Sequence, residues 1–220
     1  MNVRLLLADE FRGFARSKVM IALWVGLPLL SMALRFAQPN IEEMPLLTFV
    51  AILIAGIGGT LAAVTLSTTV TNERGRHVYD LFLVRPVRRN DLVIAKFLAA
   101  FLCLTTAVVL SILLGGVAKV LSGGRIDALI SGPHIDSLMV SLTGIAIACA
   151  VGILFGMLFN NVALSAILAA YLGNNITGAV MLPLALVSSL NIVAYCVLMG
   201  LGVPAILLGI AMYVFSRKSL

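Results

Sequence analysis

Residues 137–159 read SLMVSLTGIAIACAVGILFGMLF, a run of apolar and small residues without one charged side chain. At a rise of about 1.5 Å per residue, a helix of this length crosses a hydrocarbon layer about 30 Å thick. The apolar residues are continuous rather than alternating, and a segment in lipid must satisfy its own backbone hydrogen bonds. The run therefore predicts a transmembrane helix and not a barrel strand.

The rest of the chain repeats this pattern. Hydrophobic residues make up 61% of the 220 residues and charged residues only 11%, whereas about a quarter of the residues are charged in soluble domains. Comparable apolar runs occupy residues 19–37, 46–70, 93–117, 162–182 and 192–215. We therefore expect residues 1–220 to form one integral membrane domain of the all-α class, with six transmembrane helices.

The first segment of the chain has a different character. In residues 1–18, Val3, Leu7, Phe11 and Phe14 recur at helical spacing, while the basic side chains lie largely off that stripe. This pattern is typical of an amphipathic helix that lies in the membrane interface instead of crossing it. We expect an N-terminal interfacial helix here.

Two other connections are informative. Residues 119–136 contain several Gly and Pro residues and predict an outer loop. Residues 183–191 are apolar but broken, and they form either a plain loop or a short re-entrant pair of half-helices. Gly152 and Gly156 have a small-xxx-small spacing, which suits helix packing within one subunit or between two.

The distribution of Lys and Arg gives an orientation. Of the fifteen Lys and Arg residues, all but Arg35, Lys119 and Arg125 fall on the side of the N-terminus. Because cytoplasmic loops carry the excess of basic residues, both termini are predicted to be cytoplasmic. The net charge of +6 is thereby explained by topology, with no nucleic-acid partner. The expected location is the cell membrane, as a multi-pass protein.

The membrane interior lacks the groups that several functions need. No ionisable residue lies in the middle of a span, which argues against an ion-coupled transporter. His134 and Ser122 fall in the outer loop, so no intramembrane hydrolase site is expected. Cys103, Cys149 and Cys196 lie in apolar runs without metal-ligand spacing. We expect no catalytic residue and no metal site.

Neutral polar residues are present in the second and fifth spans. They either form hydrogen bonds between helices, worth about 1 kcal/mol or less each, or form the weakly polar lining of a substrate path. The candidates are Thr60, Thr65, Thr68, Tyr171, Asn174, Asn175 and Thr177.

Residues 71–92, TNERGRHVYDLFLVRPVRRNDL, form the only long charged segment between spans. Val78, Leu81 and Phe82 recur at helical spacing and predict a short amphipathic helix, which Pro86 ends. Its apolar face needs a cover. Lipid headgroups and a groove on a soluble partner are both suitable.

This segment resembles the cytoplasmic motif of the exporter-type (type-two) ABC transporter permeases. In that family an acidic-Arg pair is followed by an acidic-Leu step, a Pro-x-x-Arg-x-acidic turn and a Lys that opens the next span. The matching residues are Glu73, Arg74, Asp80, Leu81, Pro86, Arg89, Asp91 and Lys96. The departure is His77-Val78, where the family usually shows Gly-Thr. The N-terminal interfacial helix and the six predicted spans extend the resemblance over the whole chain.

The resemblance implies a function and partners. Two such permeases pair, as a homodimer or with a close paralogue, and each takes a nucleotide-binding ATPase subunit on the cytoplasmic face. The segment 71–92, with Phe82 beside the motif residues, then couples the ATPase to a substrate path near the first, second and fifth spans. The chain has no GxxxxGK[ST] loop, so ATP and Mg²⁺ are expected on the partner, and no enzyme activity or cofactor is expected here.

Other functions remain open at this point. A non-transporting membrane scaffold or assembly factor would use the same helices to dock a cytoplasmic partner. An intramembrane enzyme or channel is a third option. A neighbouring ATPase gene in the same operon would separate the first possibility from these two. The nine methionines show no clustered Met-x-x-Met spacing that would indicate a copper substrate.

Overall fold

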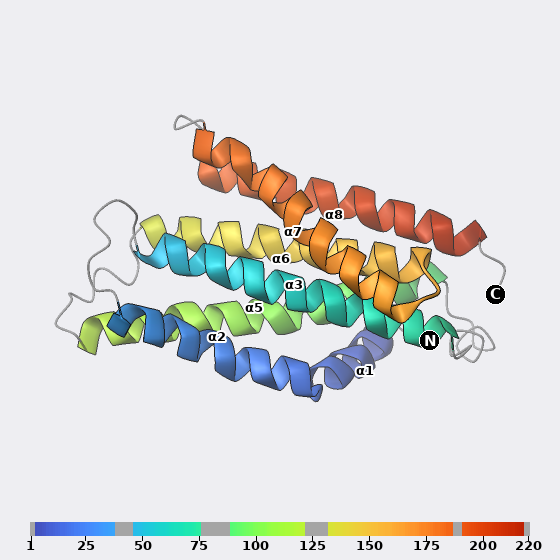
Figure 1. Cartoon of the computed structure of the whole chain (residues 1–220), viewed down its shortest axis with the longest axis horizontal. Coiled ribbons are helices and arrows are strands. Elements are labelled where there is room, and N and C mark those ends of the chain that lie inside the picture. The colour runs from blue at the N-terminus through green and yellow to red at the C-terminus, as the bar shows by residue number, and fades with distance from the viewer. Residues whose placement is uncertain (1–2, 38–45, 76–88, 122–131, 187–190, 218–220) are drawn as a thin grey trace.

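A computed structural model of the chain describes residues 3–37, 46–75, 89–121, 132–186 and 191–217 (Figure 1). All regular elements in these ranges are helices, which confirms the all-α fold. They are α1 (Val3–Ala15), α2 (Lys18–Ala37), α3 (Leu46–Gly75), α5 (Arg89–Leu121), α6 (Gly132–Leu158), α7 (Val162–Leu186) and α8 (Ile192–Arg217).

Several of the helices are long and apolar enough to cross a membrane. Within the described residues, four segments pass this test: Asn90–Leu114, Ile135–Leu158, Val162–Leu184 and Ile192–Arg217. The pair α1 and α2, which meet at a bend of 64°, makes a fifth if it counts as one broken span. The chain is thus a multi-pass membrane protein. The expected six spans are not reached in this part of the chain, although α3 coincides with the second predicted span.

The bundle is built around α6. This helix lies between α3 and α8 and also contacts α5 and α7 (Figure 1). Of its span, 72% is buried, against 11% for the span of α7. Protein neighbours therefore surround α6, whereas α7 and α8 present their outer faces to the surroundings.

Two glycines set the distance between α6 and α3. A Cβ built on Gly152 would lie 2.7 Å from the carbonyl oxygen of Ala63, and one on Gly156 would lie 2.7 Å from the Cβ of Val70. Real side chains do not approach so closely, so only glycine permits this packing. The small-xxx-small spacing therefore serves packing within one subunit.

Helix α2 packs mainly on α5, through polar contacts between helices. The indole N–H of Trp24 donates to the carbonyl of Cys103 at 2.9 Å. Further along, Ser31 donates to the carbonyl of Ser111 at 3.2 Å, and Ser111 donates to that of Leu27 at 3.1 Å. In an apolar environment such bonds hold two helices in register.

The helix ends modify two predicted connections. Helices α5 and α6 extend into the predicted outer loop from both sides, and residues 122–131 lie outside the described part. Helix α7 continues through Pro183 to Leu186, and residues 187–190 are again outside. The re-entrant arrangement of residues 183–191 therefore stays a prediction.

The packing at Gly152 can be tested by mutation. Gly152→Ala places a methyl group against the backbone of Ala63, and we expect the free energy of unfolding to fall by about 1–3 kcal/mol through overpacking. The matched control is Gly209→Ala on α8, where a Cβ meets open space and alanine favours the helix by about 1 kcal/mol. The apparent Tm of the detergent-purified variants measures the difference, and equal Tm values would contradict the close approach.

Candidate functional site

A buried lysine joins three helices at one end of the bundle. The side chain of Lys96 on α5 is 2% exposed. Its Nζ lies 2.8 Å from Glu10 Oε1 on α1 and 2.8 Å from Glu73 Oε2 on α3, with the other oxygen of Glu73 at 2.9 Å. We call Glu10, Glu73 and Lys96 the charge cluster.

The local sequence explains how Lys96 comes to be buried. It occupies the face of α5 that also carries the buried Val93, Ala99 and Ala100, one turn away on either side. The small side chains of this face leave room for the long stem of the lysine. Glu73 meets it from the last turn of α3.

Glu10 reaches the cluster because α1 packs on the bundle. Leu6 and Phe14, one turn before and after Glu10, are both buried in the core shared with α5. The apolar face of α1 is thus covered by protein, and Glu10 lies on the same face. In the sequence, an acidic residue between the apolar Leu6 and Phe14 is the pattern that could have predicted Glu10 as the third member of the charge cluster.

The electrostatics of the cluster are unbalanced, since one ammonium group serves two carboxylates. Glu10 lies on α1, before the first apolar run. Burial raises the pKa of its carboxyl above the ordinary value; Lys96 opposes this, while Glu73 and Asp9 add to it. Charges that leave water in this way are tolerated only when they are paired.

The end of α3 is also tied to α6. The guanidinium of Arg74 donates through Nη1 to the carbonyl of Met157, in the last turn of α6, where a cation favours the helix dipole. Thr71 donates to the carbonyl of Gly156 at 3.3 Å. The predicted pair Glu73-Arg74 therefore contacts α5 and α6 from adjacent positions, and it is linked to Glu10 of α1 through Lys96.

The remaining coupling residues are divided between described and undescribed parts. Asp91 lies in the first turn of α5, where an acidic side chain suits the dipole, and Arg89 begins that helix. The structure thus brings Glu73 and Lys96 together. Asp80, Leu81, Phe82 and Pro86 lie outside the described residues.

The polar residues predicted on α3 satisfy their hydroxyls within their own helix. Thr60 donates to Ile57, Thr65 to Leu61 and Thr68 to Thr65, at 3.0, 2.8 and 3.0 Å. These bonds do not join helices. The hydroxyl groups of these threonines therefore donate within α3 and not to another helix.

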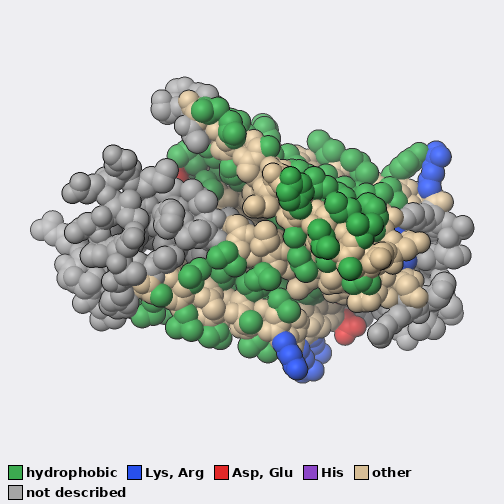
Figure 2. Space-filling model, in the orientation of Figure 1, with side chains coloured by type: hydrophobic (Ala, Val, Ile, Leu, Met, Phe, Trp, Pro, Cys, Tyr) green, Lys and Arg blue, Asp and Glu red, His purple; other side chains and the backbone are tan. Residues whose placement is uncertain are grey.

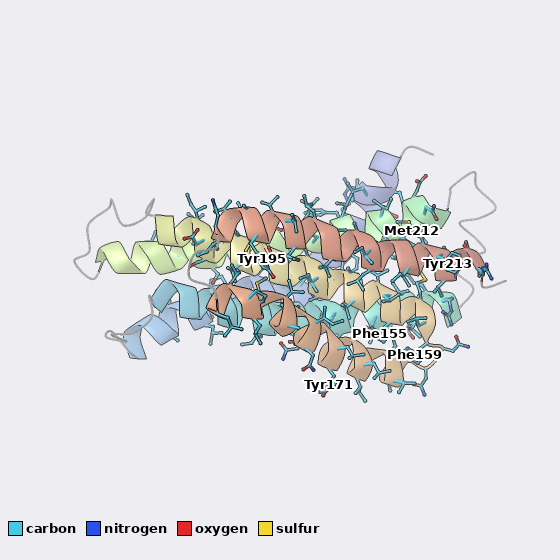
Figure 3. All side chains as sticks on the ribbon, turned by 90° about the horizontal axis from the view of Figure 1, so that it is seen from above. Phe155, Phe159, Tyr171, Tyr195, Met212 and Tyr213 are labelled. Carbon is cyan, nitrogen blue, oxygen red and sulfur yellow. The ribbon has the colours of Figure 1, made fainter. Side chains whose placement is uncertain are left out.

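Three of the four polar residues predicted on α7 are exposed, whereas Thr177 is partly buried. Tyr171 is 66% exposed and points away from the bundle (Figure 3). Asn174 and Asn175 are exposed one turn further on, and Asn175 donates to the carbonyl of Tyr171 at 2.7 Å. Around them the outer face of α7 is otherwise apolar.

A small cavity lies between α3 and α7. Thr60, Asn174 and Thr177 line it, with a volume of about 10 Å³, beside glycines of both helices. This is about the space that one water occupies. Three of the seven residues predicted to line the substrate path thus line one small polar cavity.

Charged side chains on the face shown in Figure 2 gather over the bend between α1 and α2 and at the end of α8. Between them the surface is apolar or neutral. Within the described ranges, no three His, Cys, Asp or Glu side chains lie close enough to hold a metal ion.

Removal of the lysine tests the charge cluster. Lys96→Met leaves two carboxylates in a partly buried site, and we expect a loss of about 3–5 kcal/mol in the free energy of unfolding. Glu10→Gln, which leaves Lys96 paired with Glu73, should cost less.

Acidification provides a second readout of the same variant. Without Lys96 to oppose them, burial and the neighbouring Glu73 hold the pKa of Glu10 above its value in the unfolded chain. The folded state therefore binds more protons and gains stability as the pH falls. Melting curves between pH 8 and 5 should show a partial recovery of Lys96→Met, in comparison with Gly152→Ala. A parallel pH dependence of the two variants would contradict the cluster.

Comparison with known proteins agrees with the motif. No curated protein sequence matches the chain significantly. A family described as "ABC-2 family transporter protein" matches residues 6–174, which is more than half of the 220 residues and includes all three residues of the charge cluster. The chain therefore belongs to the ABC-2 family of membrane transporter proteins.

Proposed function

We propose that the chain is the permease subunit of an ABC exporter. In this proposal two copies, or one copy and a close paralogue, form the substrate path, and a separate ATPase subunit binds each on the cytoplasmic side. ATP and Mg²⁺ belong to the ATPase. Membership of the ABC-2 family supports a membrane transport role, and the position of the charge cluster is the observation that carries the coupling role.

The charge cluster lies at the base of the predicted coupling segment. Helix α3 ends at Gly75 and α5 begins at Arg89, so the segment between them joins these two helices. Glu73 lies within the last turn of α3, and Lys96 lies about two turns into α5. Their ion pair of 2.8 Å fixes the two helices to each other just where the segment leaves and re-enters the bundle.

A displacement of the coupling segment would therefore move a connected unit. Glu10 adds α1 to it, and Arg74 adds the end of α6. Coupling between sites needs such a contiguous set of contacts between rigid elements. Because well-packed apolar side chains would stabilise a buried site at least as well as an ion pair, we infer that the charges serve positioning.

The outer face of α7 supports the proposed path between subunits. Exposed amides and a phenol at mid-span would cost free energy against hydrocarbon. Tyr171, Asn174 and Asn175 therefore need a polar neighbour, which a second copy and a hydrated path would provide. Thr65 and Thr68, which are partly buried, follow on α3 towards its proposed cytoplasmic end.

The topology completes the proposal. Six spans, with α3 as the second and α1 as the interfacial helix, place both termini and residues 71–92 in the cytoplasm of a cell-membrane protein. The basic residues at the bend of α1 and α2 and at the end of α8 (Figure 2) support this orientation.

Thiol labelling tests the orientation. In a chain without its own cysteines, a cysteine at Ser122 should react with an impermeant maleimide from outside intact cells. A cysteine at Asn90 should react only after the membrane is opened. The opposite pattern would reverse the orientation and remove the ATPase from this end.

Substitution of the predicted apolar ridge tests the coupling role. Leu81→Asp with Phe82→Asp replaces two side chains whose burial is worth about 1.5–3 kcal/mol each by charges that a groove does not accept. The variant should insert and pair normally, yet lose at least tenfold in bound ATPase or in substrate-stimulated ATP hydrolysis.

The matched control places the same charges elsewhere on the same side. Ser219→Asp with Leu220→Asp should leave ATPase binding unchanged. If the ridge variant also keeps full ATPase binding and transport, a membrane-anchored role for this segment is the better explanation. If no ATPase co-purifies with the unaltered chain, the scaffold function replaces the permease.

A further inference from the structure

An apolar groove runs between α2 and α3. Helix α2 packs on α5 and makes few contacts with α3. A space of about 490 Å³ therefore remains between α2 and α3. Its walls are Ala22, Leu23, Gly26 and neighbouring leucines of α2, opposite Ile57 and Leu61 of α3. On the face in Figure 2, apolar side chains lie among neutral atoms over α2 and α3. The described lining carries one charged side chain, Lys18, which lies at its end.

The dimensions of the groove fit one hydrocarbon chain. From Lys18 to Leu30 the groove follows α2 for about 18 Å. The volume then corresponds to a mean cross-section of about 27 Å². A single extended alkyl chain fits along this length.

The end of the groove is positively charged. Lys18 begins α2 and is exposed, and Arg12 and Arg16 are exposed just before it. They outnumber Asp9, the exposed acidic residue of α1. The first turn of α2 adds the positive end of its helix dipole. An apolar groove with a cationic end complements an amphiphile with an anionic headgroup.

We propose that this groove binds one anionic phospholipid of the bilayer, with an acyl chain between α2 and α3 and the phosphate at Lys18. The leaflet depends on the orientation proposed above, but the binding does not. A lipid at this position would contact both α2 and the stretch of α3 that leads to the charge cluster, so it would act as a structural ligand of the permease.

Native mass spectrometry of the purified full chain tests the proposal, with dioleoylphosphatidylglycerol and dioleoylphosphatidylcholine as the two probes. One phosphatidylglycerol per chain should remain bound, in preference to phosphatidylcholine. Lys18→Gln should reduce this preference about fivefold, since one cation near anionic headgroups is worth about 1 kcal/mol.

A second variant fills the groove without disturbing the fold. A Cβ at Gly26 meets open space, so Gly26→Leu extends into the groove and should abolish the retained lipid. Gly209→Leu, at an equally open position on α8, is the matched control and should bind as the unaltered chain does. Ala22→Leu replaces Gly26→Leu if that variant is poorly folded.

Three results would overturn the proposal. Equal binding by Gly26→Leu and Gly209→Leu would place the lipid elsewhere. An unchanged preference in Lys18→Gln would remove the headgroup contact. Efficient disulfide formation between two copies carrying Gly26→Cys would show that a second subunit covers the groove. None of these results bears on whether the chain binds an ATPase.

Discussion

The contact between the backbones of α3 and α6 determines the arrangement of everything else. Lipid offers no hydrophobic force to press helices together, so close packing of small residues must do so. Gly152 and Gly156 allow α6 to reach the backbone of α3 between Ala63 and Ser67, and the last turn of α3 follows two turns later. Glu73 and Arg74 lie in that turn, so the position of the charge cluster depends on the two glycines of α6.

The charge cluster fixes the relative positions of helices more than it stabilises the fold. Three elements distant in sequence converge on one ammonium group, and two carboxylates compete for it. Such an arrangement gains little over apolar packing in free energy, but it admits only a narrow range of relative positions. Arg74 and Thr71 connect the same end of α3 to α6 through hydrogen bonds. The end of α3 and the start of α5 are thereby fixed relative to each other.

Much of this was visible in the sequence, and the rest depended on tertiary contacts. Apolar length alone located the long helices, four of which, within the described residues, are long and apolar enough to cross a membrane. The motif identified Glu73 and Lys96 individually. It could not identify Glu10, since its role depends on the angle at which α1 folds back after the bend. The spacing of Gly152 and Gly156 was compatible with packing within or between subunits, and only the partner, Ala63, decided between them.

The bond between Trp24 and Cys103 gives the molecule an intrinsic optical probe. Trp24 is the single tryptophan of the chain, and its indole N–H is held by a backbone carbonyl of α5. Indole emission responds to hydrogen bonding and to the polarity around the ring. Any step of a working cycle that separates α2 from α5 will break this bond and shift the emission. The motion of α2 against α5 can therefore be followed in real time in the unlabelled protein.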